Sequence, residues 1–157
     1  MKNITKKVIL ILYLLIPSII CSEEFQITVL KASQPISKGS EEFFTGDVTV
    51  QIMTNPDSIN NYGTAYVTFA PGARSAWHTH PAGQTLVVIS GTCWTQEWNG
   101  RKVEAKAGDI IWCPEGVKHW HGASPDKKMT HLAITGVKDN KNVTWLEKVT
   151  NEQYFAK

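Results

Sequence analysis

The sequence predicts an all-β protein that folds as a single domain. Its 157 residues are the length of one domain rather than two. Short segments rich in β-branched and aromatic residues follow one another, and Pro- and Gly-containing turns separate them. Repeated short strands without intervening helices are typical of a sandwich or barrel with antiparallel pairing.

The first 22 residues are expected to be a secretory signal peptide that precedes this domain. Three lysines come before an apolar run at residues 8–20, which is too short to span a bilayer. Cleavage after Ser22 and lipidation of Cys21 both remain open, and an uncleaved membrane anchor is the alternative. We therefore expect export to the periplasm or the extracellular space, with residues 23–157 as the domain and a lipid anchor as the remaining option.

Charge and cysteine content narrow the class of partner. The formal net charge is +2, and loss of the three signal-peptide lysines would lower it to about −1. The positive charge of the full sequence is therefore no argument for binding nucleic acid or a membrane surface.

Cys93 and Cys113 are the two cysteines outside the signal peptide. In an oxidising compartment they can form a disulfide or remain two buried thiols, and the sequence leaves both possibilities open.

Five strands are predicted in chain order, followed by a weak helical pattern in the tail. Alternating or continuous apolar residues place the strands at residues 48–53, 64–70, 85–90, 109–113 and 130–137. The Asn-Gly pair at residues 99–100 predicts a type I′ hairpin turn. Only residues 145–157 have a plausible helical pattern.

Histidine placement carries the main chemical signal. All five histidines lie between residues 78 and 131. Residues two apart on a strand share a face, so His78 and His80 point the same way, as do His119 and His121. Two such pairs favour a divalent-metal site over isolated structural or surface histidines. His131 shares a face with Ala133 and Thr135.

Two stretches resemble the paired motifs of the cupin superfamily. GARSAWHTHPAGQTLVVISG (residues 72–91) matches the first motif, with Gln84 in place of the usual glutamate. GDIIWCPEGVKHWHGA (residues 108–123) matches the second, with Ala123 at its last position. The resemblance implies a double-stranded β-helix, or jelly-roll barrel. It also implies a metal inside the wider end of the barrel, held by His78, His80, Gln84 and His119.

A narrower resemblance covers residues 36–154. FAPGARSAWHTHPAGQTLVVISG, WCPEGVKHWHGASP, MTHLAI and TWLEKVTNEQY are similar to small bacterial cupins that include manganese-dependent, (R)-selective hydroxynitrile lyases. The resemblance implies a lyase that cleaves small cyanohydrins to an aldehyde and cyanide. It also implies manganese as the metal, with iron or zinc as alternatives, His131 as the catalytic base and His121 beside it.

The amide at Gln84 bears on the type of chemistry. A neutral amide leaves more positive charge on the metal than a carboxylate does, so the metal is a stronger Lewis acid and harder to oxidise. This favours polarisation of a substrate oxygen over activation of dioxygen. Alternatives are a Gln84 that only hydrogen-bonds a neighbour, a metal-dependent oxygenase, and a non-enzymatic module that binds a small anion.

Alternation along the strands also predicts the substrate pocket, which we expect to be lined by Ala65, Val67, Ala133 and Thr135. Arg74 is expected to be a solvated charge in a turn, with the steering of an anion as the alternative. A homo-oligomer, dimer or tetramer, is expected, with residues 25–54 as the segment that crosses over. Four tryptophans are expected mainly in the core or at the subunit interface: Trp77, Trp94, Trp112 and Trp120.

Overall fold

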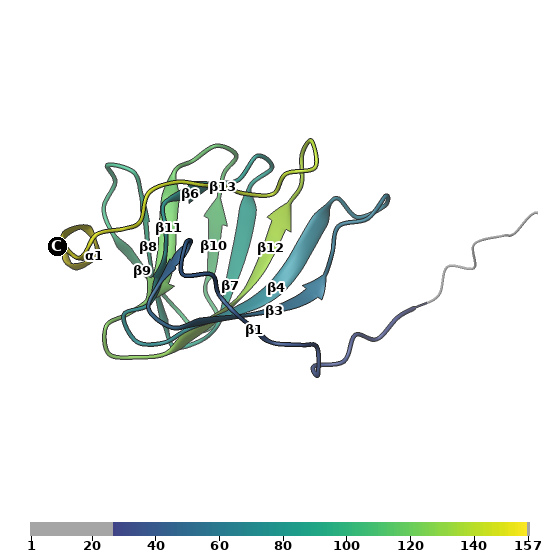
Figure 1. The fold of residues 1–157 in the computed structure, drawn as a ribbon, viewed down its shortest axis with the longest axis horizontal. Coiled ribbons are helices and arrows are strands. Elements are labelled where there is room, and N and C mark those ends of the chain that lie inside the picture. The colour runs from purple at the N-terminus through teal and green to yellow at the C-terminus, as the bar shows by residue number, and fades with distance from the viewer. Residues whose placement is uncertain (1–26, 157) are drawn as a thin grey trace, which may run out of the picture.

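Residues 27–156 are described by the computed structural model, and they form two curled β-sheets around a shared interior (Figure 1). The signal-peptide prediction lies outside these residues. The first sheet has the order β1 (Ser37–Lys38), β3 (Val48–Thr54), β4 (Tyr62–Phe69), β12 (Met129–Gly136), β7 (Gln84–Ser90) and β10 (Ile110–Cys113). All its neighbouring strands are antiparallel.

The second sheet is built around β11 (His119–Ala123). The short strands β5 (Arg74–Ser75) and β6 (His78–Thr79) pair with it, and so does β8 (Thr92–Glu97). The remaining members are β9 (Val103–Lys106), β2 (Phe44–Thr45) and β13 (Thr144–Trp145), which pair with β8, β5 and β6 respectively. The two sheets confirm the all-β jelly-roll architecture.

The five strands predicted from sequence correspond to β3, β4, β7, β10 and β12, with ends that agree within two residues. Strands β8, β9 and β11 have no clear signal in the sequence, because their apolar residues are mostly Cys, Trp and Ala rather than a β-branched run. The two-residue strands are too short to show any periodicity, so only the tertiary pairing defines them.

The turn at residues 99–100 differs from the predicted type I′ hairpin. Asn99 has a positive φ of 63°, but Gly100 does not, and the Gly100 amide donates to the Glu97 carbonyl at 2.9 Å. A type I′ turn needs positive φ at both central residues of a two-residue loop. Here β8 ends at Glu97 and β9 begins at Val103, so the loop is longer.

Gly91 allows the tight connection between β7 and β8. Its φ is 75°, and a Cβ atom built on it would lie 2.1 Å from the Lys128 carbonyl oxygen. Only a glycine accepts this conformation and this approach of the neighbouring chain without strain. Gly91, the last glycine of the first motif, is therefore needed for the backbone conformation of this turn.

The interior contains two apolar clusters. The larger one lies between the sheets and includes Val48, Phe69, Val88 and Met129, all at 2 % exposure or less. The second lies where the C-terminal helix meets the barrel and consists of Trp77, Trp120, Val149 and the helix residue Tyr154, with Trp94 against it.

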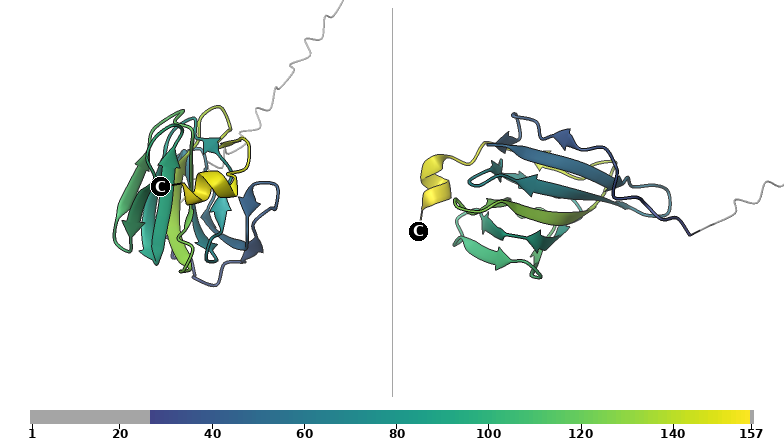
Figure 2. Two further views of the ribbon diagram at one scale, coloured as in Figure 1. Left: turned by 90° about the vertical axis from the view of Figure 1, so that its left-hand side faces the viewer. Right: turned by 90° about the horizontal axis from the view of Figure 1, so that it is seen from below.

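The tail is only partly helical. Helix α1 (Asn151–Phe155) is shorter than the pattern at residues 145–157 predicted, because Trp145 is in strand β13 and the backbone at residues 146, 147 and 149 hydrogen-bonds to the barrel. The helix starts with a capping box, in which Thr150 and Gln153 satisfy each other's backbone amides. It lies at the end of the molecule opposite the described N-terminal residues (Figure 2).

Arg74 was predicted to be a solvated charge, and this prediction is wrong. Its side chain is 5 % exposed, its Nε and Nη2 donate to the Val149 carbonyl at 3.1 and 3.0 Å, and Nη2 also donates to Asn151 Oδ1 at 2.8 Å. The guanidinium also stacks on the Tyr154 ring, 4.7 Å from its centroid. Arg74 therefore ties the C-terminal segment to the barrel, a contact between residues far apart in the chain.

Replacing Arg74 with alanine is expected to lower the free energy of unfolding by about 2–3 kcal/mol, because a buried carbonyl loses its charged donor. Denaturant unfolding followed by tryptophan fluorescence measures the change. Arg101→Ala is the matched control, since Arg101 is exposed, and it should change stability by less than about 0.5 kcal/mol. Equal stabilities of the two variants would contradict the structural role of Arg74.

Cys93 and Cys113 are free, buried thiols, so the disulfide alternative does not hold in this structure. Burial raises the pKa of both thiols to about 12, which makes them unreactive. No helix within residues 27–156 is long and apolar enough to cross a membrane. Strands β1 and β2 pair with β3 and β5 of the same chain, so the part of residues 25–54 that they cover folds back on its own barrel.

Candidate metal centre and cavity

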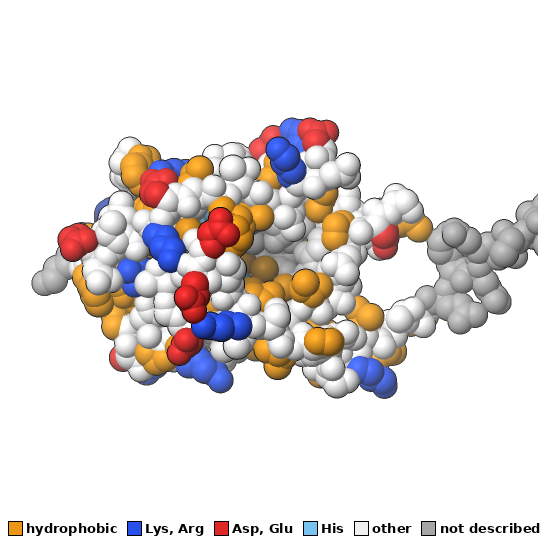
Figure 3. All heavy atoms as spheres, in the orientation of Figure 1, with side chains coloured by type: hydrophobic (Ala, Val, Ile, Leu, Met, Phe, Trp, Pro, Cys, Tyr) orange, Lys and Arg blue, Asp and Glu red, His pale blue; other side chains and the backbone are white. Residues whose placement is uncertain are grey.

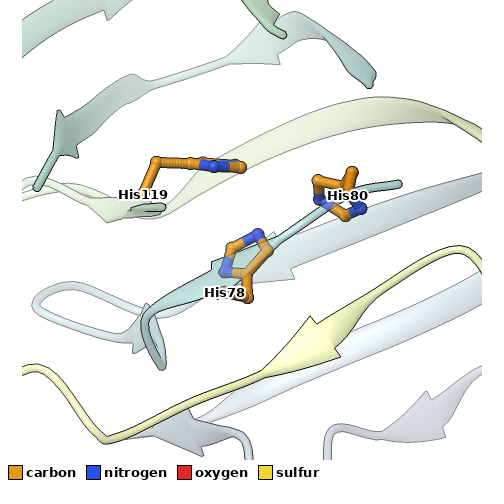
Figure 4. Close-up of side chains that lie close together, drawn as sticks. All are labelled: His78, His80 and His119. Atoms are coloured by element: carbon orange, nitrogen blue, oxygen red, sulfur yellow. The ribbon is translucent and has the colours of Figure 1, made fainter. Parts of the chain in front are cut away.

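Three of the predicted ligands converge inside the barrel. His78 on β6 and His119 on β11 are direct cross-strand partners, so their side chains lie next to each other on one face, with ring centroids 4.3 Å apart. His80 follows two residues after His78 and shares its face. One nitrogen of each ring lies within 4.8 Å of the others, and the rings point toward one another (Figure 4).

Backbone carbonyls fix the tautomer of each ring. Nδ1 of His78, His119 and His80 lies 2.9, 2.9 and 2.5 Å from the carbonyl oxygens of Ala76, Val117 and Asn142. A carbonyl can only accept, so each Nδ1 carries the proton and each Nε2 keeps its lone pair. Imidazoles that bind metals are commonly oriented in this way.

Gln84, the first residue of β7, completes the set. Its Nε2 donates to Thr135 Oγ1 at 2.9 Å, while its Oε1 is buried without a hydrogen-bond partner. Gln84 thus does hydrogen-bond a neighbour, as one alternative held, yet the bond uses the nitrogen and leaves the oxygen free.

Unpartnered atoms test whether these residues fit a metal. In the described part of the chain, four buried side-chain atoms lack a partner: His80 Nε2, His119 Nε2, Gln84 Oε1 and His131 Nδ1. Buried polar atoms normally find partners, and three of these four belong to the predicted ligand set. A divalent cation would satisfy them, so the residues fit a metal ion.

Burial keeps the histidines neutral. Desolvation is the main reason why the pKa of His80 is lowered to about 4 and the pKa values of His78 and His119 are also lowered. Neutral imidazoles present lone pairs rather than protons at neutral pH. This is the state that metal binding requires.

His121 and His131 form a hydrogen-bonded pair beside this centre. His131 Nε2 lies 3.1 Å from His121 Nδ1, so one of these two nitrogens donates a hydrogen bond to the other. The His121 ring lies 5.2 Å from that of His78, and Phe69 packs against both members of the pair. Burial lowers the pKa of His131 to about 4 and that of His121 well below its ordinary value. The pair is therefore a neutral proton acceptor next to the metal centre.

A cavity of about 240 Å³ is lined by the histidine pair and by three of the predicted ligands, His78, His80 and Gln84. All four residues predicted for the pocket line it, from β4 and β12: Ala65, Val67, Ala133 and Thr135. Within the described residues, 27–156, no Lys, Arg, Asp or Glu lines this cavity. The face drawn in Figure 3 is hollowed near its centre, with hydrophobic side chains around the hollow. His119 borders a separate groove, of about 550 Å³, beside β8, β9 and β10.

Sequence reasoning missed part of the cavity wall. Phe44 and Trp145 line the cavity from the two-residue strands β2 and β13, and Trp145 lies 4.9 Å from the His78 ring. Residues 142 and 143 contribute from a loop, and Val50 from β3. Alternation along β3 was a usable signal for Val50. The two aromatic residues had none, because their strands are recognisable only from tertiary pairing.

The other tryptophans are not in the cavity. Trp77 and Trp120 belong to the cluster at α1, as expected of core residues, and the partly buried Trp94 packs against it. Trp112, on the edge strand β10, is 61 % exposed.

Fold and site together define the class of the protein: a jelly-roll barrel whose interior holds three buried imidazoles that could bind a metal ion. The family model described as a cupin domain matches residues 65–135. The chain is also 50 % identical over 123 residues to an (R)-mandelonitrile lyase of Granulicella tundricola. This match covers 78 % of this chain and 93 % of that relative. The chain belongs to the cupin family.

Solved structures agree with this assignment. A cupin-like protein of Thermotoga maritima superposes with a TM-score of 0.72 at 37 % identity, covering 83 % of this chain and 95 % of that one. A cupin-2 domain protein of Rhodospirillum rubrum gives a TM-score of 0.61 at 17 % identity, over 82 % and 84 % of the two chains. The second likeness shows the fold alone.

Proposed function

We propose that this protein is a metal-dependent carbon–carbon lyase that cleaves cyanohydrins into an aldehyde and cyanide. The observation that carries the proposal is the neutral His121–His131 pair, which lines the same apolar cavity as the candidate ligands His78 and His80. The likeness to a relative named (R)-mandelonitrile lyase supports the choice of reaction.

His78, His80, His119 and the oxygen of Gln84 are the residues that would hold a divalent metal, for which manganese is the expected ion. When bound there, the metal supplies a Lewis acid that polarises the substrate hydroxyl. With three neutral imidazoles and a neutral amide, the protein ligands contribute no negative charge. Such a centre favours polarisation over oxidation.

The cavity favours a neutral substrate with an apolar side. Its wall combines small aliphatic residues with Phe44 and Trp145, and its described lining residues offer no charged partner for a carboxylate. The alternative of a small-anion-binding module leaves the His121–His131 pair without a task, because binding alone does not need two bases beside the metal. A small aromatic cyanohydrin such as mandelonitrile satisfies both conditions.

Proton transfer is the task of the histidine pair. When His131 Nε2 donates its hydrogen bond to His121 Nδ1, the unpartnered His131 Nδ1 keeps a lone pair that can take the hydroxyl proton. The C–C bond then breaks, its electron pair leaves with cyanide, and the hydroxyl oxygen becomes the carbonyl oxygen of the aldehyde. The pair returns the proton to cyanide, with His121 assisting, so that hydrogen cyanide leaves.

Export and self-association belong to the same proposal. Residues 1–22 carry the pattern of a signal peptide, which supports a periplasmic or extracellular protein. Ile89, Ile110 and Trp112 are apolar and 48 %, 67 % and 61 % exposed on adjacent strands of the first sheet, which supports a homo-oligomer.

The test is benzaldehyde release from mandelonitrile, measured by absorbance with manganese-loaded and with chelated protein. We expect release only from the loaded sample, and recovery when manganese is added back to the chelated one. Equal rates in the two samples would contradict the proposal. Oxygen uptake by the iron-loaded protein would then test the oxygenase alternative.

A further inference from the structure

We infer that Thr135 is a positioning residue, which holds the amide of Gln84 so that its oxygen is available to the metal. The inference rests on the metal centre proposed above and is independent of the reaction. It gives Thr135 a role beyond lining the cavity.

The register of the first sheet places the two residues together. Thr135 on β12 is the direct cross-strand partner of Gln84 on β7, and their side chains are 9 % and 6 % exposed. The Gln84 nitrogen donates to the Thr135 hydroxyl oxygen at 2.9 Å. Cross-strand neighbours on a pleated sheet keep this spacing without any adjustment of the backbone.

A buried amide nitrogen needs an acceptor, and the available acceptors compete. Thr135 Oγ1 is one, and the lone pairs on Nε2 of the ligand histidines are the others. If the nitrogen turned toward a histidine, it would occupy a lone pair meant for the metal and would withdraw the Gln84 oxygen. Because the Thr135 hydroxyl accepts the hydrogen bond of the Gln84 nitrogen, this nitrogen no longer competes with the metal for a histidine lone pair.

The distinction between oxygen and nitrogen exists only for an amide. A carboxylate at position 84 has two equivalent oxygens, so either can face the histidines without being oriented. The contribution of Thr135 to metal affinity should therefore depend on the residue at position 84. A residue that merely fills space would contribute equally with either partner.

The experiment titrates metal-free protein with Mn²⁺ and follows free Mn²⁺ by its electron paramagnetic resonance signal. Thr135→Val should weaken manganese binding by about 10-fold, while Thr135→Ser, which keeps the hydroxyl, should stay near the wild-type affinity. In a Gln84→Glu background the same Thr135→Val change should alter affinity by less than about 3-fold. Thermal unfolding of each metal-free variant checks that the fold is retained.

Thr130→Val is the matched control, because Thr130 lies on the same strand and its hydroxyl bonds that of Thr68 at 2.9 Å, away from the cavity lining. It should leave manganese affinity unchanged. Equal losses from Thr135→Val in both backgrounds, or no loss beside Gln84, would overturn the positioning role and leave the proposed function standing. Wild-type protein that takes up no manganese would overturn the metal centre itself and both proposals with it.

Discussion

Replacing His131 with alanine is expected to lower kcat for mandelonitrile cleavage by about 10²–10⁴-fold, the usual contribution of a positioned general base. The reason is that the fully buried His131 carries the unpartnered nitrogen of the histidine pair, and alanine can take no proton. Steady-state benzaldehyde release by manganese-loaded protein measures the effect. Manganese affinity should be nearly unchanged, because His131 is outside the group of three histidines that could hold the metal.

A second variant separates lost chemistry from lost packing. His131→Gln keeps polar bulk but is not a base at neutral pH, so it should be as slow as the alanine variant. Val143→Ala removes volume from the same cavity wall without a titratable group and should slow the reaction by no more than a few-fold. A folded, manganese-loaded His131 variant with nearly wild-type kcat would rule out His131 as the base.

The second large effect is expected at the metal centre. His80→Ala should weaken manganese binding by at least about 100-fold, since loss of groups that only orient a ligand already costs 10–100-fold. The buried Nε2 of His80 is one of three atoms of the predicted ligand set that have no hydrogen-bond partner and could coordinate the metal. Cyanohydrin cleavage should fall to the rate of the chelated wild-type protein.

The two histidine variants serve as controls for each other. Both remove one imidazole from the same cavity. His80→Ala should lose metal and activity together, whereas His131→Ala should lose activity and keep metal. Calorimetric titration with Mn²⁺ distinguishes them, and a His80→Ala protein that binds manganese as the wild type does would contradict the assignment of His80 as a ligand.

Much of the fold and of the candidate site could be predicted because the relevant signals are local. Strands β3, β4, β7, β10 and β12 have long enough apolar runs to be recognised one at a time. The H-x-H spacing places His78 and His80 on one face wherever the strand lies. The same parity argument placed Ala65 and Ala133 toward the interior, where both line the cavity.

The misjudged features depend on distant parts of the chain. Arg74 follows a Pro-Gly turn and looks solvated in its own segment, but residues 149 and 151 return to cover it. Phe44 and Trp145 complete the cavity wall although they are about a hundred residues apart in sequence, and their rings lie 5.7 Å from each other. No periodicity in either segment indicates that contact.

The sequence by itself determined which residue types face the interior, because side-chain alternation and ligand spacing are properties of a few consecutive residues. The tertiary structure alone decided how those faces meet. The pairing of His78 with His119, of Gln84 with Thr135, and of His121 with His131 each joins separate segments. The physical reason is that hydrogen-bond partners, burial and the lone pairs left free depend on packing between strands, and packing is set by the whole chain.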